Sequence, residues 1–181
     1  MQLVEQQIGG PLGDHQYGGV CVGCHLGGIG QGLELTKDWF VEARLQIAAN
    51  CLGAAIRGFE LANEWASQRV QFGVPIRRHQ AIEFMLADMA MQVEVARQYM
   101  IYAARRRDAG LPSDKEASIA KLFASEMAEK VCSAAIQVHG GYGYVSDFPV
   151  ERYYRDVRVT KIYEGTSHIQ KLIIARQILA E

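Results

Sequence analysis

The chain has 181 residues, 49% hydrophobic and 22% charged, as expected for a globular protein with a sizeable core. Its 19 basic and 20 acidic residues give a formal net charge of -1, so it has no general attraction to nucleic acid or anionic membranes. No apolar run is long enough to span a bilayer, and no secretory signal opens the chain. We therefore expect no nucleic-acid partner and no membrane insertion.

Residues 1–32 are rich in glycine and are interpreted as an irregular or short-stranded leader. Within them, Cys21, Cys24 and His25 form C-x-x-C-H, the attachment signature of c-type haem. That attachment requires an export route, so we favour a coincidental match. Residues 27–32 only loosely resemble a phosphate-binding loop, because they do not follow a strand in a βαβ unit. Cys51 and Cys132 fall in helical stretches and are expected in the core.

Two long helices are predicted next, because apolar residues recur at steps of three and four. The first runs from about residue 33 to Gln68. A loop over residues 69–75 ends it, with glycine and proline as helix breakers. The second helix carries a near-heptad apolar stripe from Ile82 to Ala103 and ends at residues 108–110.

A third long helix is predicted to begin at Ser113, which forms a capping box with Glu116. Its apolar stripe is Ile119, Phe123, Met127, Val131, Ala134 and Val138. Residues 140–144 stop the helix and are expected to form a flexible aromatic loop. Long amphipathic helices joined by short loops predict an all-α antiparallel bundle over residues 33–181, without a substantial sheet.

Two shorter helices are predicted at the end of the chain, and Glu164 lies between them. The first spans residues 149–162, with proline at its first position. The second has Thr166 or Ser167 as its N-cap. A carboxylate on such a joint can point into a cavity and act as a base. By itself, an acidic residue at a helix end is more often a solvated capping residue.

Five motifs together resemble one family, the acyl-CoA dehydrogenases. They follow the family's order and spacing, which makes the set far more specific than any member. The motifs are Arg69-x-Gln71-Phe72-Gly73, His79-Gln80-Ala81-Ile82, Gln137-Val138-His139-Gly140-Gly141-Tyr142-Gly143, Glu151-Arg152-x-x-Arg155-Asp156 and Ile162-Tyr163-Glu164-Gly165-Thr166-Ser167. From about residue 27 onward the chain is similar to the C-terminal helical domain of short- and medium-chain members.

The resemblance also assigns the leader. Members of the family are roughly twice this long, with a helical domain and a β-domain of ordinary domain size before this point. Residues 17–28 resemble the last β-domain strand and its connection to the helical domain. The resemblance thus implies that residues 1–32 are a remnant of the β-domain and a linker, without the N-terminal domain and most of the β-domain. It also implies that Cys21 and Cys24 fall on this strand and the following turn by coincidence.

The resemblance implies FAD-dependent α,β-dehydrogenation of a short- or medium-chain acyl-CoA to the trans-2-enoyl-CoA. Glu164 matches the family's base, which removes a Cα proton while a hydride leaves Cβ for the flavin. The implied partners are acyl-CoA, further copies of the chain in a dimer or tetramer, and electron-transferring flavoprotein as electron acceptor. The implied compartment is the bacterial cytoplasm or the mitochondrial matrix.

Site residues are carried over from the same motifs. Those expected to contact FAD, partly across a subunit boundary, are Arg69, Phe72, Gln80, Gln137, Val138, His139, Gly140, Gly141, Thr166, Ser167 and His168. Those expected beside the acyl-CoA are Val41, Glu42, Ala43, Arg44 and Gly165. No metal site is expected. Two alternatives stay open: a catalytically silent helical oligomerisation module, and an acyl-CoA oxidase or flavin monooxygenase of the same fold.

Overall fold

A computed structural model describes residues 16–17, 20–21 and 30–180 of the chain. The chain divides into two units, residues 1–40 and 41–181, which are described separately. In the first unit, β1 (Gln16–Tyr17) pairs antiparallel with β2 (Val20–Cys21). The resemblance implied one strand here, and the structure has two. The haem-like motif lies outside the described residues except for Cys21, as do residues 27–29 of the glycine-rich run.

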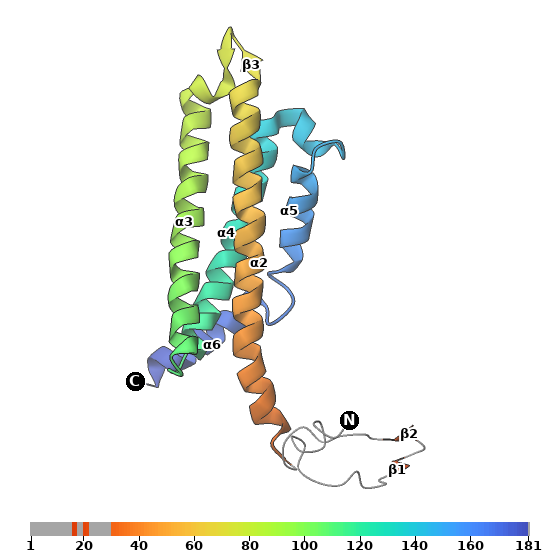
Figure 1. The fold of residues 1–181 in the computed structure, drawn as a ribbon, viewed down its shortest axis with the longest axis vertical. Helices are drawn as coiled ribbons and strands as arrows, with labels where there is room; N and C mark the ends of the chain where they lie inside the picture. Colours follow the sequence, from red (N-terminus) through yellow and green to blue (C-terminus); the bar gives the residue numbers. More distant parts are fainter. Residues whose placement is uncertain (1–15, 18–19, 22–29, 181) are drawn as a thin grey trace. The chain divides into compact units, whose positions relative to one another are not determined.

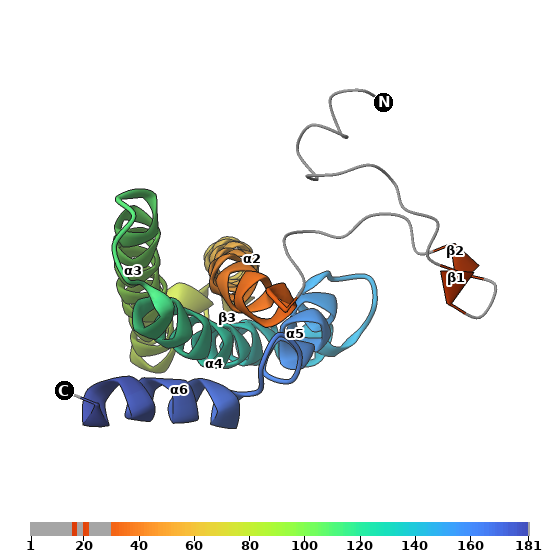
Figure 2. The same ribbon diagram turned by 90° about the horizontal axis from the view of Figure 1, so that it is seen from below.

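The second unit is an antiparallel helical bundle, which confirms the predicted all-α fold. Figure 1 shows α2 (Gly32–Gln68), α3 (Gln80–Asp108), α4 (Asp114–His139) and α5 (Val150–Val159) running alternately in opposite directions. The last helix, α6 (Ser167–Leu179), crosses one end of the bundle and packs against α4 (Figure 2). In this second unit, α4 contacts α3, α5 and α6.

Two connections predicted as loops are regular instead. Between α2 and α3, β3 (Val70–Gln71) and β4 (Val74–Pro75) form an antiparallel hairpin, followed by the 3-10 helix η1 (Ile76–Arg78). Phe72 and Gly73 at its tip have φ of 52° and 82°, and two positive values are typical of a type I′ hairpin turn. After α4, residues expected to be flexible form the 3-10 helix η2 (Gly140–Tyr144).

The capping box predicted at the start of α4 is wrong. Ser113 is the N-cap, but its side chain makes no capping hydrogen bond. The Glu116 carboxylate instead lies 3.7 Å from the Arg106 guanidinium at the end of α3. An ion pair between neighbouring helices thus takes the carboxylate that the capping box would use.

The last two helices differ slightly at their ends from the prediction. Pro149 is the N-cap of α5 rather than its first residue, and the helix ends at Val159 rather than Ile162. Thr160 closes it, because its hydroxyl donates to the Val157 carbonyl at 2.6 Å. Thr166 is the N-cap of α6, as predicted, and accepts a hydrogen bond from the Ile169 N–H.

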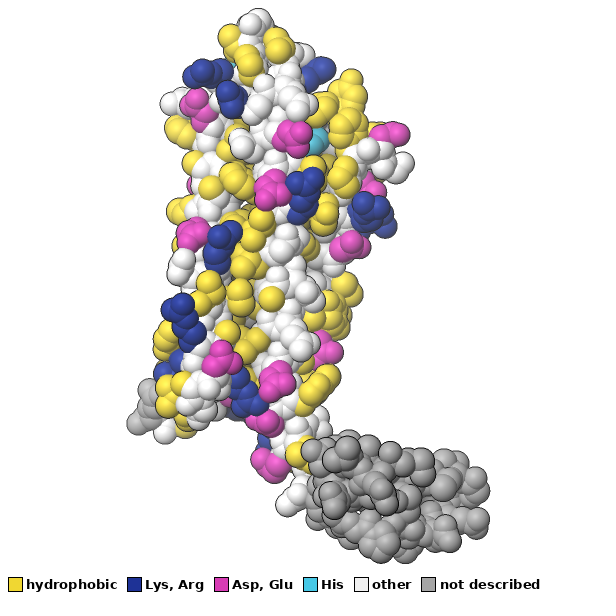
Figure 3. All heavy atoms as spheres, viewed as in Figure 1, with side chains coloured by type: hydrophobic (Ala, Val, Ile, Leu, Met, Phe, Trp, Pro, Cys, Tyr) yellow, Lys and Arg dark blue, Asp and Glu magenta, His cyan; other side chains and the backbone are white. Residues whose placement is uncertain are grey.

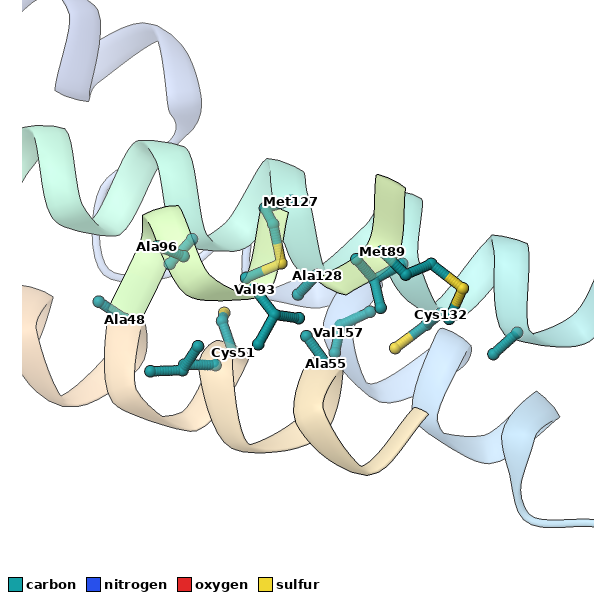
Figure 4. Packing of buried hydrophobic residues seen from close by; sticks show 14 of the residues in the cluster. Ala48, Cys51, Ala55, Met89, Val93, Ala96, Met127, Ala128, Cys132 and Val157 are labelled. Atoms are coloured by element: carbon teal, nitrogen blue, oxygen red, sulfur yellow. The ribbon is translucent and has the colours of Figure 1, made fainter. Parts of the chain in front are cut away.

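The core depends on small residues of α4 that the apolar stripe did not include. Phe123, predicted in that stripe, is 39% exposed. The alanines of α4 are buried instead, and they let neighbouring helices approach on several sides: Ala117, Ala120, Ala124, Ala128 and Ala135. On α2, a Cβ added to Gly58 would lie only 3.5 Å from the Cys132 sulfur. Close helix contact therefore builds this core (Figure 4).

Cys51 and Cys132 lie in this core, as predicted, and both are free thiols (Figure 4). Burial raises the pKa of Cys51. Burial, with a smaller contribution from Cys51, raises the pKa of Cys132 to about 12. Both side chains are thus protonated, apolar-like core residues at neutral pH.

Charged side chains of both signs are interspersed on the face shown in Figure 3, where hydrophobic side chains also reach the surface between α2 and α3. Arginines near the end of α3 make contacts both within this helix and with α2. The Arg107 guanidinium lies 3.2 Å from the Glu42 carboxylate, and Arg106 lies over the Tyr102 ring. Among the described residues, no helix has the length and apolar character needed to cross a membrane.

Candidate active site

The segment between α5 and α6, residues 160–166, is called the joint, and it carries Glu164. Glu164 has φ of 52° and Gly165 has φ of 87°. For a residue with a side chain, this left-handed conformation costs about 1–2 kcal/mol. The conformation of Glu164 therefore has to be held by contacts around it.

Two buried polar side chains provide these contacts. The Lys121 amino group, from α4, donates to the Gly165 carbonyl at 2.8 Å. The Gln170 amide, from α6, donates to the carbonyls of Glu164 at 3.2 Å and Gly165 at 3.1 Å. Both Lys121 and Gln170 have 0% exposure. The joint is thus fastened to two helices through its backbone.

Gly165 lies directly against the end of the Gln170 side chain. A Cβ at this position would lie 2.4 Å from the Gln170 amide nitrogen. The positive φ independently favours glycine here. The left-handed backbone conformation, rather than the contact with the movable end of Gln170, therefore accounts for the glycine that follows Glu164.

The Glu164 side chain itself is partly exposed. Among the described residues, its backbone N–H donates to no protein acceptor. Burial lowers the pKa of Lys121, and the nearby Glu164 carboxylate acts in the opposite direction. The Lys121 ammonium and the Glu164 carboxylate are thus close enough to interact electrostatically.

The residues expected beside acyl-CoA hold the bundle together in this structure. Val41, Ala43 and Arg44 are buried. The Arg44 guanidinium pairs with the Asp114 carboxylate at the start of α4, and Glu42 pairs with Arg107. Their assignment to substrate binding stays a prediction.

A cluster of rings, called the aromatic cluster, lies where α2 ends and η2 begins. It consists of Trp65, His139, Tyr142 and Phe148. The Trp65 ring lies 5.2 Å, centroid to centroid, from each of the other three. Burial lowers the pKa of His139, and its Nδ1 donates to the Ala135 carbonyl at 2.8 Å. The imidazole is therefore neutral, with its proton on Nδ1.

Several residues expected to bind cofactor gather beside this cluster. The Arg69 guanidinium lies 5.5 Å from the centroid of the Tyr142 ring. Phe72, at the hairpin tip, is 94% exposed and lies edge-on to His79. Gln80 opens α3 at the same end, where Gln137 and Val138 also lie because α4 runs parallel to α2. The structure thus brings this part of the predicted set together.

The remaining predicted contacts, Thr166 to His168, lie at the joint. Lys121, which contacts the joint, and His139 of the aromatic cluster are 18 residues apart in α4, or about 27 Å along the helix. The predicted cofactor residues therefore form two separate groups. One chain places them too far apart to surround the same part of one ligand.

Each group has features that fit a ligand carrying hydroxyl and phosphate groups. At the joint, the Ser167 hydroxyl is buried and has no hydrogen-bond partner among the residues that the structure describes. At the aromatic end, Cβ atoms added to Gly140 or Gly141 would meet nothing within 4 Å, so the backbone is open there. Arg69 adds a planar donor suited to phosphate. In the described part of the chain, no group of three or more His, Cys, Asp or Glu residues is arranged to hold a metal.

Lys121 and Gln170 were not identified from the sequence. Long polar side chains on helices are usually solvated, so nothing marked these two as buried. One signal was available for Lys121: it lies four residues after Ala117 and three before Ala124, on the alanine-rich face of α4.

Residues 30–179 match the family model described as acyl-CoA dehydrogenase, C-terminal domain. The chain belongs to the acyl-CoA dehydrogenase family. Members of this family are flavoprotein oxidoreductases.

Individual relatives agree with this assignment. The chain is 49% identical to an acyl-CoA dehydrogenase of Bacillus subtilis, covering 85% of the chain and 41% of that protein. It is 42% identical to the caffeyl-CoA reductase-Etf complex subunit CarC of Acetobacterium woodii, with coverage of 85% and 41%. The solved butyryl-CoA dehydrogenase of Megasphaera elsdenii matches with a TM-score of 0.84 at 41% identity, covering 85% of the chain and 40% of that structure. The chain thus spans about two fifths of these relatives.

Proposed function

We propose that this chain contributes the catalytic base and part of the FAD site to an acyl-CoA dehydrogenase that converts a short- or medium-chain acyl-CoA to the trans-2-enoyl-CoA. The observation that carries the proposal is Glu164, a partly exposed carboxylate on a backbone held in a left-handed conformation by two buried side chains. The butyryl-CoA dehydrogenase similarity supports a short acyl chain.

Glu164 would act as a general base toward the Cα–H of the thioester. Its ionised carboxylate takes the proton, and the electron pair of the broken C–H bond enters the new Cα–Cβ double bond as a hydride leaves Cβ. Bound FAD would supply the acceptor for that hydride. The Glu164 N–H, which has no protein acceptor among the described residues, is available to the thioester oxygen and would stabilise its developing charge.

The two separated groups of predicted cofactor contacts support a site shared between subunits. Ser167 and its neighbours would contact the FAD beside Glu164 of the same chain. Arg69, Phe72 and the Gln137 to Gly141 segment would contact the FAD of another copy. Arg69 would bind its phosphates with paired hydrogen bonds.

Exposed apolar side chains on α3 and α4 support association into a dimer or tetramer. Phe84 is 61% exposed, Met91 57% and Val95 52%. A groove of about 270 Å³ lies between the two helices, with these residues along it: Gln92, Ile119, Leu122, Phe123, Glu126, Met127 and Lys130. Apolar surface of this kind favours burial against another copy.

We also propose electron-transferring flavoprotein as the redox partner, since one relative is named as part of an Etf complex. The bacterial cytoplasm or the mitochondrial matrix is the proposed compartment.

The test is Glu164→Gln in the FAD-loaded holoenzyme that contains this chain. The amide keeps the shape of the side chain but cannot accept the proton, so the rate of anaerobic flavin bleaching by butyryl-CoA should fall about 10²–10⁴-fold or more. Flavin content and acyl-CoA binding should not change.

The matched control is Glu151→Gln, at the start of α5. Glu151 is paired with Arg155 at 2.8 Å, and this pairing lowers the pKa of its carboxyl. Its loss should cost little in rate. A Glu164→Gln holoenzyme that bleaches as fast as the parent would show that Glu164 is not the base.

A further inference from the structure

Lys121 is an unusual residue for the interior of a helical bundle. Its side chain is fully buried, although lysine is almost never fully buried unless it is paired. Its hydrogen-bond acceptor among the described residues is a backbone carbonyl, that of Gly165, and none of the ion pairs of the described residues includes it. Its burial is thus offset by a neutral carbonyl in the joint, together with the electrostatic attraction of the nearby Glu164 carboxylate.

Gln170 repeats the pattern from the opposite side. It is fully buried in α6, and its amide nitrogen donates to two consecutive carbonyls of the joint. Its own carbonyl oxygen has no hydrogen-bond partner in the described part of the chain. Side chains from α4 and α6 therefore converge on the peptides that flank Gly165.

An apolar residue at either position would fill the space without the desolvation that a buried polar group incurs. The polar groups instead fix the orientation of the joint, because a hydrogen bond is directional and holds a carbonyl in one orientation, whereas apolar contact does not. The carbonyl fixed most firmly belongs to the residue after Glu164. The carbonyl of Glu164 itself is the second acceptor.

We propose that Lys121 and Gln170 are positioning residues, which hold the peptides at Glu164 and Gly165 so that the carboxylate and the N–H of Glu164 keep a fixed direction. This inference rests on the proposed function of Glu164 as the base. Because Lys121 is enclosed, it acts through the joint and does not reach substrate.

The first test needs no flavin and uses this chain with Lys121→Met. Hydrogen exchange of backbone amides is measured separately for the joint and for the middle of α4. Amides of residues 160–168 should exchange about tenfold faster or more, because the joint opens locally. Amides of α4 should not change, and the midpoint of thermal unfolding should stay the same or rise, since a buried charge is removed.

The matched control is Lys171→Met, an exposed lysine on α6, which should change neither region. Gln170→Met is the second variant, and it decides the question by the same criteria if Lys121→Met does not fold. Unchanged exchange in the joint overturns the inference. Faster exchange in both regions together with a lower midpoint also overturns it, because that is the result of a purely structural role.

The second test uses the FAD-loaded holoenzyme. In the Lys121→Met and Gln170→Met variants the Glu164 carboxylate is held less firmly, so kcat should fall about 10- to 100-fold. KM for the acyl-CoA should stay within about twofold, since the contacts that bind the substrate before reaction are not affected. A rise in KM with unchanged kcat would contradict positioning. If Glu164→Gln keeps full activity, the proposed function fails, whereas joint exchange still reports whether Lys121 and Gln170 order the backbone.

Discussion

The two ends of the bundle are held in different ways. At the aromatic cluster, neutral rings pack on one another, and burial keeps even His139 uncharged. At the joint, a lysine and a glutamine are buried to hold two carbonyls, and Glu164 is kept in a conformation that side chains rarely adopt. Packing of the rings stabilises the fold at the aromatic cluster. At the joint, the burial of two polar side chains costs folding free energy but fixes the orientation of the carbonyls of Glu164 and Gly165.

Different parts of the bundle therefore determine its stability and the orientation of the Glu164 backbone. Removing a ring from the aromatic cluster should cost folding free energy. Removing the polar contacts of the joint should instead make the backbone at Glu164 and Gly165 less well ordered. The predictions below act on the aromatic end, where the loss of stability is expected to be large.

Trp65→Ala should have the largest effect, because it removes the ring that the other three share. We expect a loss of about 3 kcal/mol in the free energy of unfolding. Urea unfolding followed by circular dichroism measures it. Trp39, the other tryptophan of the chain, is 55% exposed, and Trp39→Ala should stay within about 0.5 kcal/mol of the parent. Similar losses in the two variants would show that the aromatic cluster does not contribute more to the free energy of unfolding than an exposed ring does.

Gly143→Ala should destabilise the η2 helix by about 2 kcal/mol, as overpacking does. The added Cβ would lie 2.7 Å from the Ile136 carbonyl oxygen and 2.9 Å from the Ile136 Cα, which are backbone atoms that cannot rotate away. Gly141→Ala, two residues earlier, is the control, because its Cβ would meet nothing within 4 Å. A difference of less than about 0.5 kcal/mol between the two variants would contradict this packing.

The smallest effect is a change in pH dependence at His139. Burial lowers its folded-state pKa below the ordinary 6.5, so the unfolded chain takes up a proton first as the pH falls. Stability present above pH 6.5 is therefore lost as the pH falls through the folded-state pKa. Unfolding midpoints between pH 7 and pH 5 should decline less steeply in His139→Gln than in the parent. A flat slope in the parent would refute the role of His139.

The sequence predicted the features that depend on local pattern. The end of α2 at Gln68, the end of α3 at Asp108 and a cap at Thr166 or Ser167 were predicted correctly, because helical periodicity, glycine, proline and capping side chains act within a few residues. The capping box failed because Arg106, from another helix, takes the Glu116 carboxylate. Such competition is not visible in a single segment.

The site was predicted unevenly for the same reason. The family motifs led to the prediction of Glu164 and the cofactor residues, and the separation of those residues into two groups follows from where the motifs lie in an antiparallel bundle. Lys121 and Gln170 could not be recognised, because their burial depends on α4 and α6 meeting at the joint. In the sequence of one helix, a lysine among alanines is expected to be exposed. Its burial becomes evident only when the positions of the neighbouring helices are known.

The two thiols of the core have a consequence for oxidation chemistry. With a pKa of about 12, Cys132 exists as thiolate in only about one molecule in 10⁵ at pH 7. Since peroxides and alkylating agents react with the thiolate, enclosure and protonation both protect this sulfur. Cys132 is therefore protected from oxidation by its place in the core of the bundle.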